Sequence, residues 1–94
     1  MHRSIMQELT VNKCFLCGRQ GQVEVHHCIH GTAGRRKAEA DGLLVNLCPE
    51  CHRKLHDTGR GDKELMSVAE ARWINYNMAS VEEFIGRYGK NYIV

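Results

Sequence analysis

Two CxxC pairs constrain the fold of this chain more than any other feature: Cys14 with Cys17, and Cys48 with Cys51. Two such knuckles separated by a long loop are the pattern of a tetrahedral four-cysteine zinc site. A chain of 94 residues has a thin hydrophobic core, so a metal staple is expected. The alternative is two disulfides in a secreted miniprotein, but we expect neither a signal peptide nor an apolar run of membrane length. Cys28 is expected to be a small buried side chain.

Four of the six histidines have a spacing that indicates chemistry. His26 and His27 are adjacent, and adjacent side chains on an extended segment point to opposite faces. One of them can therefore bind a metal while the other moves a proton. His52 and His56 are four residues apart, so a helix would place both on one face, where they can hold one ion. Three imidazoles on a divalent cation, with a fourth beside it as a base, suit the hydrolysis of a phosphodiester.

A zinc finger is the alternative use of the first knuckle. Its ligands would be Cys14, Cys17, His26 and His30. That site would leave the second CxxC pair without a role, so we favour the four-cysteine site.

The order of apolar residues, glycines and caps predicts a small α+β fold. Pro49 suits the first turn of a helix, which Gly59 would end. The expected elements are a short helix in 2–9, a strand and knuckle over 11–18, a strand over 22–26, a flexible basic loop over 31–37, a strand over 43–47 and a helix from 49 to about 56.

The C-terminal part is predicted to be helical. Asp62 is placed to cap a helix whose buried stripe is Leu65, Ala69, Trp73 and Tyr76. Ser80 to Glu83 has the form of a capping box, and the short helix that follows would carry Phe84, Ile85 and Tyr88 and stop near Gly89.

The charge is unevenly distributed. The net charge of +2 is too small to indicate a nucleic-acid partner by itself. Residues 1–61 carry nine basic and six acidic residues, or +3, whereas the tail from residue 62 carries four basic and five acidic residues, or −1. The positive charge therefore lies in the part of the chain that holds the paired histidines.

The stretch from Cys14 to His56 resembles the HNH endonucleases, also called ββα-metal nucleases, in the subgroup with an integral zinc on four cysteines. The matching motifs are the first CxxC, then Glu24-Val25-His26-His27, then Asn46-Leu47 with the second CxxC, His52 and His56. The layout of the remainder is similar to short HNH proteins of bacteriophages and prophages. The resemblance implies a zinc-stapled ββα-metal (His-Me finger) fold with C-terminal helices. Residues 1–94 would form a single HNH nuclease domain, with a core at about 11–58 and a helical extension at about 62–90.

The resemblance also implies roles for individual residues. His27 corresponds to the general base, and His26, His52 and His56 to ligands of one catalytic divalent ion, Mg²⁺, Mn²⁺, Ni²⁺ or Zn²⁺. Asn46 corresponds to the family asparagine, for which we favour a role in orienting the loop and the base. His30 has no family counterpart and is expected to be a solvent-exposed loop histidine. The structural Zn²⁺ would be held by Cys14, Cys17, Cys48 and Cys51.

The function implied is a metal-dependent DNA endonuclease that uses one metal and a histidine base and leaves 5′ phosphate and 3′ hydroxyl ends. Its partner would be DNA, bound mainly through backbone phosphates. The protein would act in the cytoplasm of a bacterial host, beside phage packaging or recombination proteins, and no membrane partner is expected. The alternative function is a noncatalytic zinc-binding module that contacts DNA or a protein, as a phage adaptor or inhibitor. The candidate DNA-binding residues are Arg35, Arg36, Lys37, Arg53 and Lys54, although a solvated charged face would look the same.

Overall fold

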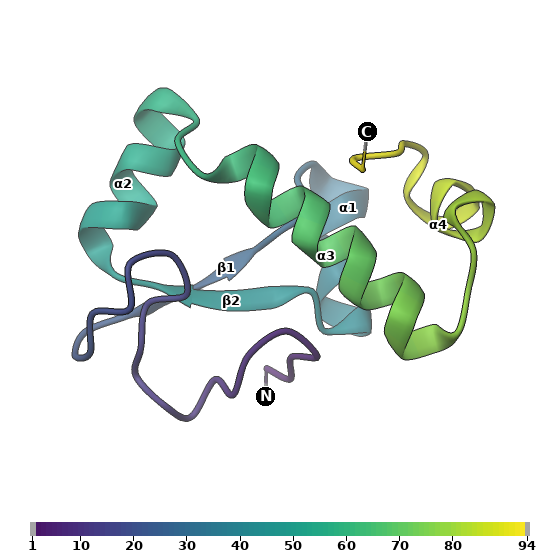
Figure 1. Cartoon of the computed structure of the whole chain (residues 1–94). Helices are drawn as coiled ribbons and strands as arrows, with labels where there is room; N and C mark the ends of the chain where they lie inside the picture. The colour runs from purple at the N-terminus through teal and green to yellow at the C-terminus, as the bar shows by residue number, and fades with distance from the viewer. Residues whose placement is uncertain (1, 94) are drawn as a thin grey trace.

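The computed structural model describes residues 2–93 and has two strands and four helices (Figure 1). Their bounds are β1 Glu24–His27, α1 Thr32–Asp41, β2 Leu44–Leu47, α2 Pro49–Thr58, α3 Asp62–Asn77 and α4 Val81–Tyr88. The two strands and α2 make the expected ββα arrangement, and the small α+β class is confirmed.

The two strands form an antiparallel sheet that fixes the direction of each histidine. His26 pairs with Val45, and His27 pairs with Leu44. Successive residues of a strand point to opposite faces, so the pairing sends the two imidazoles to opposite sides of the sheet. All four residues of β2 are buried, which anchors the sheet in the core.

Residues 32–41 form a helix, so the predicted flexible loop is wrong. Alanine and long charged side chains fill this segment, and these are good helix formers even without an apolar stripe. The helix ends at Gly42, whose φ of 79° is in the left-handed region. A Cβ atom at Gly42 would also lie 3.1 Å from the backbone of Arg3 and Ile5. Both the left-handed φ and this close approach therefore favour glycine at this position.

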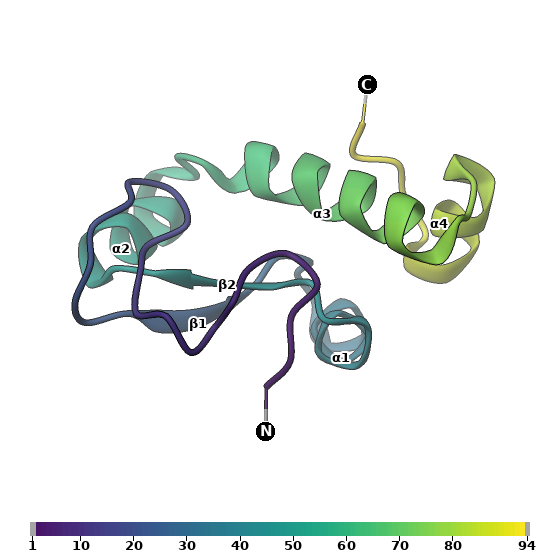
Figure 2. The same cartoon turned by 60° about the horizontal axis from the view of Figure 1, so that its bottom comes forward.

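The N-terminal segment is irregular, and the helix predicted for residues 2–9 is wrong. Instead the segment lies beside β2 (Figure 2), where the Ser4 hydroxyl donates to the Leu44 carbonyl at 2.6 Å. The strand predicted for residues 11–18 is reduced to one bridge between Lys13 and Gln20. Separate side-chain and backbone hydrogen bonds therefore hold this segment in place of a ladder, among them the one from the Ile5 N–H to the Gly42 carbonyl at 2.9 Å.

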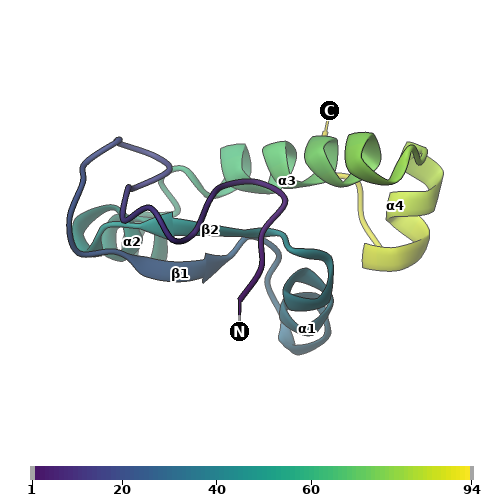
Figure 3. The same ribbon diagram turned by 90° about the horizontal axis from the view of Figure 1, so that it is seen from below.

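The C-terminal helices follow the prediction in most details. Leu65, Ala69 and Trp73 are buried on α3, but Tyr76 is 67% exposed, so the predicted stripe is one residue too long. Asp62 is the first residue of α3 and does not cap it, because Gly61 occupies the cap position without a side-chain hydrogen bond. The capping box at Ser80 is confirmed. Figure 3 shows α4 at the end of α3 that lies away from α2.

Asp41 connects α1 to the C-terminal helices. Its carboxylate accepts hydrogen bonds from Trp73 Nε1 at 2.9 Å and from the Tyr88 hydroxyl at 2.6 Å. Arg87 donates to both carboxylate oxygens, from Nη2 at 2.8 Å and from Nε. Phe84 packs edge-on against the Trp73 ring, with the ring centroids 5.5 Å apart. The extension is therefore packed onto the same core as the sheet.

Candidate metal centres

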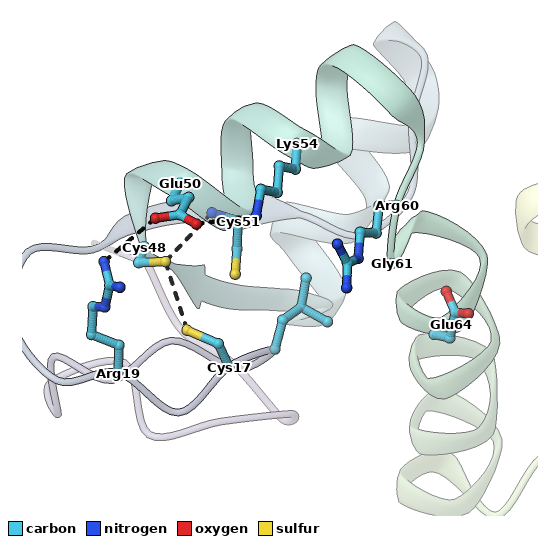
Figure 4. Close-up of a pocket in the computed structure, with 10 residues that line it drawn as sticks. Cys17, Arg19, Cys48, Glu50, Cys51, Lys54, Arg60, Gly61 and Glu64 are labelled. Atoms are coloured by element: carbon cyan, nitrogen blue, oxygen red, sulfur yellow. Dashed lines mark hydrogen bonds and ion pairs between the residues drawn. The ribbon is translucent and has the colours of Figure 1, made fainter.

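The four cysteines of the two CxxC pairs form one cluster, in which the sulfur atoms all lie within 4.8 Å of one another. Cys17 Sγ is 3.8 Å from Cys48 Sγ, and Figure 4 shows Cys17, Cys48 and Cys51 pointing toward a common space. No disulfide joins the cysteines of the described residues. Four converging thiols are the donor set of a structural zinc site, and the finger that used His26 and His30 is excluded.

The knuckles supply backbone donors to their sulfurs. The N–H of Cys17 donates to Cys14 Sγ at 3.5 Å, and the N–H of Cys51 donates to Cys48 Sγ at 3.4 Å. Burial raises the pKa of Cys14, but N–H donors of Cys17, Cys48 and Leu16 outweigh it and lower the pKa to about 6. A thiolate is the form that binds a metal. Cys28 is buried away from this cluster as predicted, and burial raises its pKa to about 12.

His26, His52 and His56 form a second cluster, with one nitrogen of each ring within 4.8 Å of the others. The His26 ring lies 5.2 Å from that of His52 and 6.0 Å from that of His56, centroid to centroid. His26 is 4% exposed, and its Nε2 has no hydrogen-bond partner among the described residues. Burial, and then the charges of His52 and His30, lower the pKa of His26 to about 4. The ring is therefore neutral at pH 7 and keeps a free lone pair.

A carboxylate fixes the orientation of His52. Glu24 Oε1 accepts from His52 Nδ1 at 2.7 Å, so a neutral His52 ring carries its lone pair on Nε2. That atom is 3.1 Å from Nε2 of His56, which must be the donor in this arrangement. A carboxylate on the far nitrogen of a metal-binding imidazole is the usual support of such a ligand.

His27 is not part of the cluster of His26, His52 and His56. Its Nε2 is 2.9 Å from Oε1 of Glu39, a residue of α1. Both oxygens of the same carboxylate lie within 3.1 Å of Nδ1 of His2. Hydrogen bonds from His2 and His27 lower the pKa of Glu39. Sequence reasoning missed Glu39 because it placed the preceding residues in a loop, although the helix-forming composition around Ala38 and Ala40 was a usable signal.

Asn46 ties the first knuckle to β2. Its side-chain amide donates to the carbonyls of Leu9 and Val11 at 3.0 and 3.2 Å, and its backbone N–H donates to Gln7 Oε1 at 2.7 Å. The side chain thus holds the loop before Cys14, and none of these hydrogen bonds reaches His27.

His30 is exposed, as expected of a loop histidine, but it has partners. Its Nε2 donates to Asp62 Oδ1 at 2.6 Å, and its ring stands edge-on to His26 at 5.8 Å between centroids. Donor atoms of His26, His30 and Asp62 also lie within 4.8 Å of one another. The first residue of α3 therefore reaches the rim of the histidine cluster.

The candidate DNA-binding residues are distributed over two places. Arg35 lines a cleft of about 350 Å³ together with the clustered histidines and His27. Lys37 donates to the Arg87 carbonyl at 2.7 Å, so it fastens α1 to α4. Lys54 pairs with Glu50 at 3.1 Å and lines a different cleft, beside the cysteines (Figure 4). Arg36 and Arg53 are exposed.

The sequence of residues 14–58 matches the family model described as HNH endonuclease. This segment belongs to the HNH endonuclease family. The match covers the cysteine cluster, the three clustered histidines, His27 and Asn46, and it indicates a nuclease or nucleic-acid-binding function. Comparison with curated proteins and with solved structures gave no match. Within residues 2–93, no helix has both the length and the apolar character needed to cross a membrane.

Proposed function

We propose that the protein is a metal-dependent DNA endonuclease that uses His27 as its general base. One observation carries this proposal: three imidazole nitrogens converge within 4.8 Å, and His27, the neighbour of His26 on β1, is among the residues that line their cleft but is not part of the cluster. An HNH segment that only stabilised its own fold would gain nothing from a separate, oriented His27.

The donor set fits a catalytic divalent cation. His26 Nε2 is buried and has no hydrogen-bond partner within residues 2–93, which is costly unless an ion or another polar group satisfies it. Nε2 of His52 and Nε2 of His56 lie 3.1 Å apart, and both could bind one ion if His56 carried its hydrogen on Nδ1 instead. When bound, such an ion supplies Lewis-acid stabilisation of charge on the phosphate and on the departing oxygen.

In the proposed reaction, His27 takes a proton from a water molecule that attacks phosphorus in line with the departing 3′ oxygen. Neutral His27 can accept because only one of its nitrogens is bonded to Glu39. The products would carry 5′ phosphate and 3′ hydroxyl ends, as the family resemblance implies. Asn46 would contribute indirectly, by holding the loop that packs on β2.

DNA would lie over the histidine cleft and be held mainly through its phosphates. Arg35 lines that cleft, and Arg36 and Arg53 are exposed. Such contacts give affinity with little sequence information. Lys37 and Lys54 have protein partners, so their contribution to DNA binding would be smaller.

We also propose that residues 1–94 act as one nuclease domain, with a core at about 11–58 and an extension at about 62–90. The contacts of Asp41 with Trp73, Arg87 and Tyr88 support one packed unit. A phage origin and a place in the bacterial cytoplasm, beside packaging or recombination proteins, rest on the likeness to short phage HNH proteins.

The noncatalytic module is the second candidate function, and one observation favours it. Nε2 of His27 is occupied by Glu39, which would block a base that needed that nitrogen. In this case the histidines would have a structural role, and the protein would bind DNA or a partner protein without cleaving it.

Plasmid cleavage separates the two functions. Purified protein with its structural zinc is incubated with supercoiled DNA and Mg²⁺, Mn²⁺, Ni²⁺ or Zn²⁺ in turn. We expect nicked or linear product with at least one ion, and its loss in the double variant His52→Ala, His56→Ala. Intact plasmid with every ion would favour the noncatalytic module.

A further inference from the structure

We propose that Glu39 is the positioning residue for His27, and that it makes Nδ1 of His27 the atom that accepts the proton. This inference rests on the proposed nuclease function. It assigns a role to a side chain of α1 that the sequence motifs do not include.

Glu39 contacts His27 directly, and backbone hydrogen bonds fix the end of α1 beside this contact. Glu39 Oε1 lies 2.9 Å from His27 Nε2. The end of α1 is fixed by two backbone hydrogen bonds to the Ala38 carbonyl, from Gly42 and from Leu43 at 2.9 Å. The carbonyl of Leu43 accepts in turn from the N–H of Cys28, which follows His27 in the chain. Backbone hydrogen bonds therefore hold the helix and the strand end together beside the contact.

The chemistry of the pair determines the tautomer. An ionised carboxylate has only acceptors, so Nε2 of His27 must carry the hydrogen. A neutral imidazole then has its lone pair on Nδ1. Among residues 2–93 no group hydrogen-bonds to that nitrogen, and His27 is one of the residues that line the cleft of the three clustered histidines. Nδ1 is therefore the ring nitrogen free to accept a proton from water.

His2 holds the same carboxylate from its other side. Its Nδ1 is 3.1 and 3.0 Å from the two oxygens of Glu39, and both side chains are partly open to solvent. Two imidazoles on one carboxylate restrict its rotation more than a single contact would. His2→Ala is therefore a matched variant that removes a neighbour of Glu39 but leaves its contact with His27.

Loss of positioning should be separable from loss of DNA binding. Glu39 is on the same helix as Arg35 and Arg36, so its negative charge opposes phosphate binding. Removing that charge should leave KM for DNA unchanged or lower it. A fall in kcat alone would then report the geometry of His27.

The kinetic experiment compares Glu39→Ala with Glu39→Gln in the zinc-loaded protein. We expect kcat to fall at least about 10- to 100-fold in Glu39→Ala, the range known for carboxylates that support metal-binding histidines. Glu39→Gln keeps an oxygen acceptor for Nε2–H and should recover part of the loss. His2→Ala should have a smaller effect than Glu39→Ala. Unchanged kcat in Glu39→Ala would mean that Glu39 does not position His27, and increased kcat would mean that Glu39 blocks the base; either result would overturn the proposal.

The tautomer can be measured without any activity. Long-range ¹H–¹⁵N NMR spectra of histidine-labelled protein at pH 8 should show His27 with hydrogen on Nε2, and a mixture of tautomers in Glu39→Ala. Hydrogen on Nδ1 in the unmodified protein would overturn the proposal even if DNA is cleaved. If no ion supports cleavage, the nuclease function fails, and these spectra still decide whether Glu39 fixes the ring.

Discussion

Replacing Asp41 by Asn should lower the free energy of unfolding by about 2–3 kcal/mol. Asp41 accepts hydrogen bonds from Trp73, Tyr88 and Arg87. A hydrogen bond to a charged group contributes about 1.5–3 kcal/mol, but the contributions of one network do not add. Asn keeps one acceptor oxygen and Arg87 is partly exposed, so the loss should be nearer to one such bond than to three.

The effect of Asp41→Asn should depend on pH. Burial opposes ionisation of Asp41, but hydrogen bonds from Arg87, Tyr88 and Trp73 hold its pKa below the ordinary value. For an acid with a depressed pKa, the stabilisation is complete above the pKa of the unfolded chain, about 3.9, and is lost as pH falls through the folded pKa. The difference in stability between the two proteins should therefore be constant above about pH 5 and shrink below about pH 4.

Urea unfolding of the zinc-loaded proteins, followed by circular dichroism, measures this difference. Asp57→Asn is the matched control, because Asp57 is exposed and its change should shift stability by less than about 0.5 kcal/mol. Equal midpoints for the two variants at pH 7 would contradict the role of Asp41 in docking α3 and α4.

Three further predictions concern the metal, the backbone and the DNA face. Chelation of zinc should unfold the domain, whereas Cys28→Ala should retain the metal, and a folded metal-free protein would refute this. Met78 has a φ of 51° and is 94% exposed, so Met78→Gly should relieve about 1–2 kcal/mol of left-handed strain and add about 0.5–1 kcal/mol of entropy cost. The net result should be a small gain in stability in urea unfolding, and a loss of stability would contradict the strain argument. Reversing the charges of Arg35 and Arg36 should weaken binding to unrelated DNA sequences equally and flatten its salt dependence, whereas Lys63→Glu on α3 should change both less. An unchanged salt dependence of DNA binding would mean that Arg35 and Arg36 are not part of the DNA-binding surface.

The clustering of donor atoms was predictable because it depends on local spacing. A CxxC pair brings two thiols together within one turn, and residues four apart share a helix face, as His52 and His56 do. The opposite directions of His26 and His27 follow from strand geometry alone. The predicted cysteine cluster is therefore confirmed, whereas the roles of the histidines stay predictions.

The supporting contacts were not predictable, because they join segments that are distant in the sequence. Glu39 reaches His27 only because residues 32–41 are a helix. The sequence did not predict that helix, because glycines lie at its start and its apolar residues have no helical periodicity. Asp62 reaches His30 only because α3 starts beside the histidine cleft. Tyr76 continues the helical period but lies beyond the surface that α3 buries, so periodicity overestimates the core at a helix end.

The most direct test of the catalytic account separates the adjacent histidines by comparing His27→Ala with His26→Ala in metal affinity and plasmid nicking. His27→Ala should keep its affinity for the catalytic ion by calorimetry and lose about 10²- to 10⁴-fold in nicking rate, the usual contribution of a positioned base. His26→Ala should bind the ion more weakly, and raised metal should restore part of its activity. Equal metal affinity in both variants, together with undiminished nicking by His27→Ala, would contradict the account.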